Sequence, residues 1–83
     1  MNIIICDDRI DDRKNLSDLL SDYGEKKNYE FAITEYDSGE QLCEEQSALE
    51  ACQILFLDIN MQGMDGLKTA MRIKEKYPKL LVV

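Results

Sequence analysis

Short apolar runs alternate with longer amphipathic stretches along the chain. The runs NIIIC, QILFLD and KLLVV are continuous and aliphatic, which is typical of strands buried on both faces. The segment YEFAITEY instead alternates apolar and polar residues, which favours a strand near a sheet edge. We therefore expect strands at residues 2–6, 29–36, 53–58 and 79–83.

The stretches between these strands carry helical patterns. In the first, apolar residues recur near the 3.6-residue period, which predicts a helix over residues 9–23 that Gly24 ends. Its apolar positions are Ile10, Leu16, Leu19, Leu20 and Tyr23. Ser38, with Gln41 three residues later, forms a capping box that predicts a second helix over residues 39–50.

The third predicted helix covers residues 65–77 and stops before Pro78, because proline disfavours helical backbone in the preceding residue. We expect its inward side chains to be Leu67, Ala70, Met71 and Tyr77. Alternation of strands and helices predicts one α/β domain over residues 1–83, with a parallel sheet between helices.

Three aspartates follow the apolar runs. Asp7 and Asp8 come directly after the first strand, and Asp58 ends the third. Ligands of such sheets bind beyond the carboxyl ends of the strands, so these carboxylates meet if the two strands are neighbours. Their repulsion would be relieved by Mg²⁺, which prefers oxygen ligands. Such an ion would hold a phosphate, and one carboxylate could attack its phosphorus to form an acyl phosphate.

Composition excludes several other functions. The formal net charge of −7 argues against nucleic-acid binding by this segment. Cys6, Cys43 and Cys52 lack a metal-binding spacing, and the absence of histidine removes the commonest partner ligand of zinc. No apolar run approaches the ~20 residues that span a bilayer and no signal peptide opens the chain, so we expect a cytoplasmic protein with reduced thiols.

In combination, IIICDD, SGEQL and FLDINMQGMDG resemble the CheY-like receiver domain of two-component response regulators. The segments ICDD, SGE and FLDI are most similar to those of receivers that carry a LytTR-type DNA-binding output domain. The resemblance implies a flavodoxin-like doubly wound parallel sheet, here with strand order 2-1-3-4. It also implies a phosphoprotein that accepts its phosphoryl group from a sensor histidine kinase and controls transcription through its output domain. Such a receiver is a regulatory phosphoacceptor rather than an enzyme.

Carried over by position, the resemblance makes Asp58 the phosphoacceptor. It makes Asp7 and Asp8 ligands of Mg²⁺, with Asp8 the more direct one, and adds the backbone carbonyl of Asn60 to the metal shell. Gly66 corresponds to the glycine that shapes the loop after the phosphorylation site.

The chain departs from the family pattern in two places. Gln62 replaces the usual proline, which should loosen the loop. The hydroxyl residue that ends a receiver's fourth strand and the lysine that ends its fifth have no counterpart, because the sequence stops at Val83 before either position. Lys79 precedes the last strand and cannot replace that lysine. We therefore expect a receiver truncated after its fourth strand, without its last strand–helix unit or output domain. Its open edge and uncovered sheet face should lead to self-association.

Other functions fit the same residues less well. As a calcium loop, Asp58, Asn60, Gln62 and Gly63 would fill early positions, but Thr69 stands where a bidentate glutamate is required. A haloacid-dehalogenase-like phosphatase needs an aspartate at the position of Asn60. The remaining alternative is a degenerate receiver that serves only as a protein–protein interaction module. Asp65 is expected to be a helix N-terminal charge, and Met61 and Met64 are expected to be packing or loop residues.

Overall fold

The strands form a parallel sheet in the order β2-β1-β3-β4, which confirms the predicted order 2-1-3-4. The structure is a computed structural model that describes residues 1–61 and 66–83. Its strands are β1 (Asn2–Cys6), β2 (Ala32–Tyr36), β3 (Ile54–Leu57) and β4 (Leu81–Val82). The described residues contain no helix long and apolar enough to cross a membrane.

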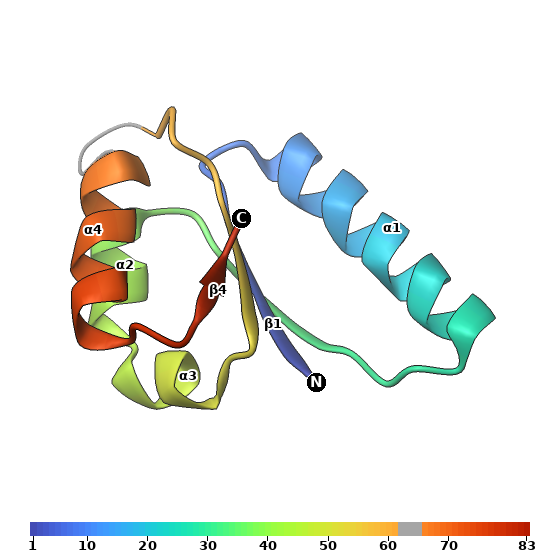
Figure 1. The fold of residues 1–83 in the computed structure, drawn as a ribbon. Coiled ribbons are helices and arrows are strands. Elements are labelled where there is room, and N and C mark those ends of the chain that lie inside the picture. The colour runs from blue at the N-terminus through green and yellow to red at the C-terminus, as the bar shows by residue number, and fades with distance from the viewer. Residues whose placement is uncertain (62–65) are drawn as a thin grey trace.

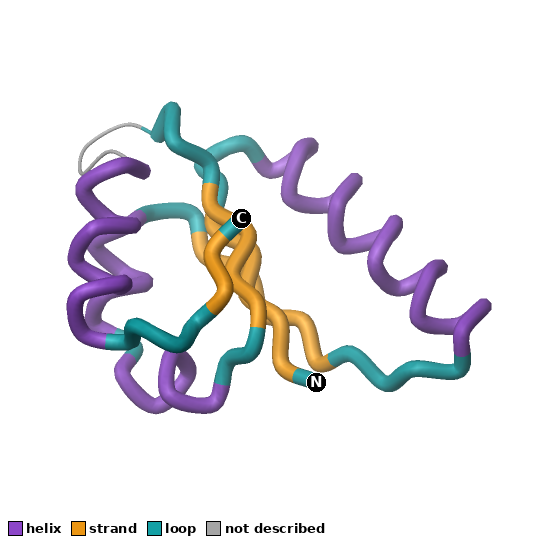
Figure 2. Tube along the Cα trace, viewed as in Figure 1, coloured by secondary structure: helices purple, strands orange, loops and turns teal. Residues whose placement is uncertain are grey.

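Helices cover both faces of this sheet (Figures 1 and 2). Helix α1 (Ile10–Lys27) lies on one side, and α2 (Gly39–Glu44), α3 (Gln46–Ala51) and α4 (Gly66–Lys76) lie on the other. Strand β1 is central, and Ile3, Ile4 and Ile5 are at most 2% exposed, as expected for a continuous apolar run between two layers. The main core lies between the sheet and α2–α4, and contains Ile4, Cys6, Leu42, Leu49, Cys52, Leu55, Met61, Ile73 and Leu80.

The prediction that Gly24 ends the first helix was wrong. Helix α1 continues to Lys27, and Asn28 adopts the left-handed conformation (φ 62°) that closes it. Asparagine tolerates this conformation better than most residues, and the C-terminal position therefore did not require glycine. Of the apolar positions expected on this helix, Ile10, Leu19 and Tyr23 are at least half exposed.

The predicted helix over residues 39–50 is two short helices. The backbone leaves helical geometry at Glu45 (φ −94°, ψ 68°), which separates α2 from α3. The predicted start is confirmed, because the Ser38 hydroxyl accepts a hydrogen bond from the Gln41 N–H at 3.1 Å. Strand β2 is also shorter than predicted and begins at Ala32, after Tyr29 and Phe31.

Only part of the predicted inward face of α4 is confirmed, since Ala70 is half-buried and Tyr77 packs against the core. Thr69 and Ile73 are buried, whereas Leu67 and Met71 are 63% and 65% exposed. Gly66, Thr69 and Ile73 are spaced by three and four residues and so lie on one face of the helix. The hydrophobic pattern alone therefore misplaced Leu67 and Met71.

Candidate functional site

The carboxyl ends of β1 and β3 lie side by side. Cys6 is paired with Leu57, and the Asp58 N–H donates to the Cys6 carbonyl at 3.0 Å. On the other side of β1, the Asp7 N–H donates to the Tyr36 carbonyl at 3.1 Å. The ladder therefore continues one residue past β1 and β3, and it fixes Asp7 and Asp58 at the same edge of the sheet.

Asp7, Asp8 and Asp58 form an acidic cluster at this edge. One carboxylate oxygen from each lies within 4.8 Å of the others. Two oxygens on opposite sides of an Mg²⁺ are about 4.2 Å apart, so a cluster of this width is suited to one such ion. The donor set is all oxygen, which fits a hard cation and not a thiophilic one. The structure thus brings together the three aspartates predicted to bind magnesium, and their role as ligands stays a prediction.

The cluster places Asp7 in an unfavourable electrostatic environment. Burial raises the pKa of its carboxyl group above the ordinary value, and the negative charges of Asp58 and Asp12 raise it further. A hydrogen bond between the two carboxyl groups of Asp7 and Asp58 acts in the same direction, while the Arg9 backbone N–H, 2.9 Å from Asp7 Oδ1, opposes the shift. A bound cation would reverse this balance.

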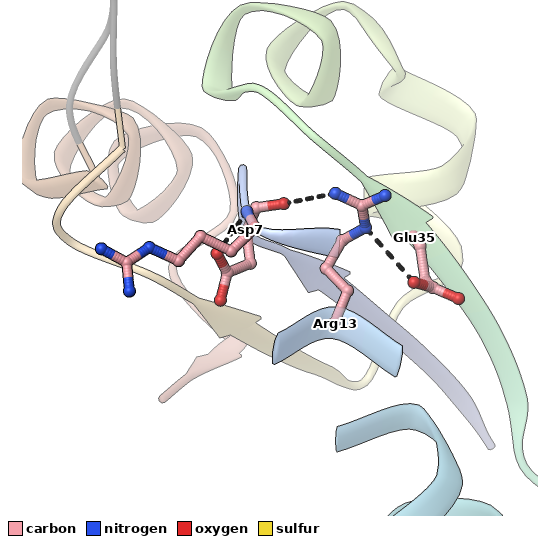
Figure 3. Close-up of polar contacts among 4 residues, drawn as sticks. Asp7, Arg13 and Glu35 are labelled. Carbon is pink, nitrogen blue, oxygen red and sulfur yellow. Dashed lines mark hydrogen bonds and ion pairs between the residues drawn. The ribbon is translucent and has the colours of Figure 1, made fainter. Parts of the chain in front are cut away.

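Arg13 is a supporting residue that the sequence did not reveal. Its Nη1 donates to the Asp7 carbonyl oxygen at 2.8 Å, and its Nε lies 3.3 Å from Glu35 Oε1 (Figure 3). This side chain ties the start of α1 to the end of β1 and to β2, and so holds the backbone of Asp7 in place. The only sequence feature that pointed to Arg13 was a basic residue directly after Asp11 and Asp12 in the first turn of a helix. That feature alone does not predict a supporting role.

The backbone after β3 orients Asp58. The Asn60 N–H donates to Asp58 Oδ1 at 3.0 Å, which fixes the plane of the carboxylate. Gly66, the first residue of α4, lies directly against the main chain of Asp58 and Ile59, and a Cβ at Gly66 would overlap these backbone atoms. The predicted role of Gly66 in shaping this loop therefore has a steric cause.

Met61 packs beneath the site. It is 6% exposed, and the Cys6 thiol lies 3.7 Å from its sulfur, which agrees with its expected role as a packing residue. The expectations for Gln62, Met64 and Asp65, and the calcium-loop position Gly63, lie outside the described residues. The backbone carbonyl of Asn60 as a metal ligand stays a prediction.

Comparisons with known proteins were consistent with this geometry. The model of the response regulator receiver domain family matches residues 3–83. A CheY-like response regulator receiver domain protein from Methanospirillum hungatei JF-1 is 28% identical with a TM-score of 0.75, and the match covers 98% of this chain and 60% of that one. A two component transcriptional regulator AraC from Clostridium phytofermentans ISDg is 30% identical with a TM-score of 0.72, covering 99% and 63%.

A third match lies in the crystal structure of the histidine kinase ThkA in complex with the response regulator protein TrrA. It is 27% identical with a TM-score of 0.75, and covers 98% of this chain and 64% of that chain. The chain thus spans less than two thirds of the length of each of these solved chains. No curated protein sequence matched significantly.

Proposed function

The chain belongs to the response regulator receiver domain family, and we propose that Asp58 is its phosphoacceptor in a two-component signalling system. The observation that carries this proposal is the meeting of Asp7, Asp8 and Asp58 at the carboxyl ends of β1 and β3. A structural role would not require three carboxylates to lie together against their mutual repulsion. The arrangement serves a reaction in which the repulsion is relieved on binding.

The chemistry assigned to this chain is a nucleophilic displacement at phosphorus. A carboxylate oxygen of Asp58 forms the new O–P bond while the P–N bond of a phosphohistidine breaks, and the departing imidazole takes a proton. The Asn60 N–H, at 3.0 Å from Asp58 Oδ1, orients the carboxylate for attack in line with the leaving group. Arg13 holds the Asp7 backbone and keeps the neighbouring carboxylates in register.

Asp7, Asp8 and Asp58, together with the Asn60 carbonyl, would hold the Mg²⁺ that the family's chemistry implies. When bound, that ion supplies positive charge to the oxygens of the transferring phosphoryl group. The chain's own contribution is to keep the acidic ligands together in the absence of a cation, through the strand ladder and the contacts of Asp7.

The donor is proposed to be a sensor histidine kinase. Residues 1–83 contain no histidine, so the phosphohistidine lies outside this segment. Support comes from the ThkA–TrrA complex, in which a histidine kinase and a response regulator bind each other. We place the protein in the cytoplasm as a regulatory phosphoacceptor that turns over no substrate of its own.

We further propose that residues 1–83 are the N-terminal portion of a receiver, as the 60–64% coverage of the solved chains suggests. The output domain is proposed to be a LytTR-type DNA-binding domain that regulates transcription, on the strength of the ICDD, SGE and FLDI segments. The matched transcriptional regulator from Clostridium phytofermentans is consistent with an output of that general kind.

The 83-residue chain is also proposed to self-associate. Strand β4 pairs with β3 on one side and is an edge strand among the described residues, and Leu81 and Val83 are 56% and 62% exposed. An exposed apolar edge of this kind can pair with a second copy. Light scattering over a range of protein concentrations tests this, and a constant monomer mass throughout would contradict it.

The phosphoacceptor is tested by intact mass after incubation with acetyl phosphate and Mg²⁺. The wild-type chain is compared with Asp58→Asn and with Asp37→Asn, which removes an exposed aspartate outside the cluster. A single phosphoryl adduct on wild type and Asp37→Asn, absent from Asp58→Asn, is the expected result. The same set is measured on a chain extended by the C-terminal part of the Methanospirillum relative. No adduct on either length would contradict the proposal and favour an interaction module.

A further inference from the structure

An open cavity lies at the end of α1 that is remote from the acidic cluster. It has a volume of about 600 Å³ and is lined by residues of the last turns of the helix and of the connection that returns to β2. Its lining residues are Ser21, Gly24, Glu25, Asn28, Tyr29, Glu30 and Phe31. The acidic cluster adjoins the other end of α1, so this surface is separate from the phosphoacceptor.

Three aromatic rings follow one another beside this cavity. The ring centroids of Tyr23 and Tyr29 are 6.2 Å apart, and those of Tyr29 and Phe31 are 6.0 Å apart, with tilted planes. Tyr23 and Tyr29 are 50% and 56% exposed. Exposed aromatic side chains are enriched at protein interfaces because they offer large, rigid contact surfaces. The rings therefore provide a surface suited to a partner.

Gly24 is needed for the shape of this surface. A Cβ there would lie 3.1 Å from Cδ2 of Phe31 and 3.1 Å from the Tyr29 carbonyl oxygen. The Tyr29 N–H also donates to the Gly24 carbonyl at 2.8 Å. The returning segment is thus held directly against the helix backbone, with Phe31 packed on the glycine and Tyr29 left at the surface.

The charged groups of the cavity are acidic. Glu25 and Glu30 line it, and its described lining contains no lysine or arginine, although Lys26 and Lys27 follow in the same turn of the helix. The Met1 ammonium group lies nearby and donates to the Glu30 carbonyl oxygen at 3.0 Å. A guanidinium group stacks on tyrosine faces and binds carboxylates through two parallel hydrogen bonds. The formal net charge of −7 would also attract a cationic segment over longer distances.

We propose that this cavity is a docking surface for an arginine-bearing segment of a partner protein. The guanidinium stacks on the exposed ring of Tyr29 and pairs with Glu25 and Glu30, which flank the cavity. This surface goes beyond the phosphoryl chemistry and does not depend on Asp58.

The test is an NMR titration of the ¹⁵N-labelled chain with the peptide acetyl-Ala-Arg-Ala-Arg-Ala-amide. The matched probe replaces both arginines with citrulline, which keeps the shape and removes the charge. We expect the arginine peptide to shift the amide signals of Gly24, Asn28 and Tyr29, and to bind at least about two- to five-fold more tightly than the citrulline peptide.

Two variants separate this surface from general attraction to an acidic protein. Tyr29→Leu and the double variant Glu25→Gln/Glu30→Gln should each weaken binding by about two- to five-fold or more. The control Glu44→Gln/Glu75→Gln removes the same charge from exposed positions on α2 and α4 and should leave the affinity unchanged. The proposal would be overturned if the citrulline peptide, or a peptide with lysine in place of arginine, bound as tightly as the arginine peptide. It would also be overturned if the control variant lost as much affinity as the two test variants, or if no amide signal at the cavity shifted. Asp58→Asn should bind as wild type does, so the outcome is independent of the phosphoacceptor test.

Discussion

The carboxylates of Asp7 and Asp58 lie within 4.8 Å of each other at the ends of two hydrogen-bonded parallel strands. Burial raises the pKa of Asp7 most, and the negative charge of the nearby Asp58 raises it further. The fold therefore holds together two groups that repel each other when both are ionised. This relationship links the stability of the protein to occupancy of the site, and the first two predictions follow from it.

Asp7→Asn should stabilise the metal-free protein and weaken its response to Mg²⁺. The amide oxygen can still accept the Arg9 N–H, while the repulsion from Asp58 is removed. We expect a gain of up to about 1 kcal/mol in the free energy of unfolding, measured by urea denaturation in EDTA. In wild type, millimolar Mg²⁺ should raise the urea concentration at the midpoint of unfolding, because the ion binds the folded state. Asp12→Asn, which removes a charge outside the cluster, should keep the Mg²⁺ response. A variant Asp7→Asn that responds to Mg²⁺ as strongly as wild type would contradict the assignment of Asp7 as a ligand.

The stabilisation by Asp7→Asn should depend on pH. The pKa of Asp7 is raised in the folded protein above its ordinary value of 3.8, so folding favours the protonated form. Protonated Asp7 costs the fold nothing at low pH, and its penalty develops as pH rises through the folded-state pKa. The difference in unfolding free energy between Asp7→Asn and wild type should thus be largest near neutral pH and shrink towards zero below about pH 4. If the difference in unfolding free energy instead grew as pH fell, the pKa of Asp7 would be lowered by folding and not raised.

The sequence predicted the strands and the three aspartates that follow them from strong local signals, whereas the strand order was implied by the resemblance to receivers. Continuous aliphatic runs identify buried strands, and residues that follow parallel strands gather at one edge. Helix details were less predictable. Helix α1 ends at Asn28 and not at the predicted Gly24. The break between α2 and α3 at Glu45 has no distinctive signal in the local sequence. The role of Arg13 depends on a contact with a backbone carbonyl, which composition and spacing do not encode.

The buried face of α4 shows a second limit. Leu67 and Met71 are exposed, whereas Ile73 and the less hydrophobic Thr69 are buried. Close approach of Gly66 to the main chain of Asp58 and Ile59 sets the rotation of the helix, and hydrophobicity could not reveal that contact. The site and the orientation of α4 are therefore coupled through one glycine.

Gly66→Ala should destabilise the protein by about 2 kcal/mol or more, because the added methyl group overlaps the backbone of Asp58 and Ile59. It should also slow phosphorylation, since the nucleophile's own backbone must shift. Gly24→Ala is the matched comparison. There the new Cβ meets Phe31 Cδ2 and the Tyr29 carbonyl oxygen at 3.1 Å, and alanine's better helix propensity offsets part of the strain. Urea denaturation measures the free energy of unfolding of both variants. If Gly66→Ala lost no more stability than Gly24→Ala, the steric explanation would be contradicted.

Cys6 should resist alkylation although it is one residue from the site. It is fully buried, and burial together with the charge of Asp7 raises the pKa of its thiol to about 12. The reactive thiolate is therefore scarce in the folded protein. With iodoacetamide at pH 8.5, we expect Cys6 to react far more slowly than half-buried Cys43, and both to react quickly in urea. Peptide mass mapping over time gives the rates, and comparable native rates would argue against this environment for Cys6.

The central claim is that the acidic edge delivers one nucleophile, Asp58, to phosphorus. The most direct measurement locates the phosphoryl group after reaction with acetyl phosphate and Mg²⁺. Borohydride reduces an acyl phosphate of aspartate to homoserine, and tandem mass spectrometry then identifies the converted residue. Our account predicts homoserine at position 58 alone, and none when EDTA replaces Mg²⁺. Homoserine at position 7 or 8, or conversion that is independent of Mg²⁺, would contradict it.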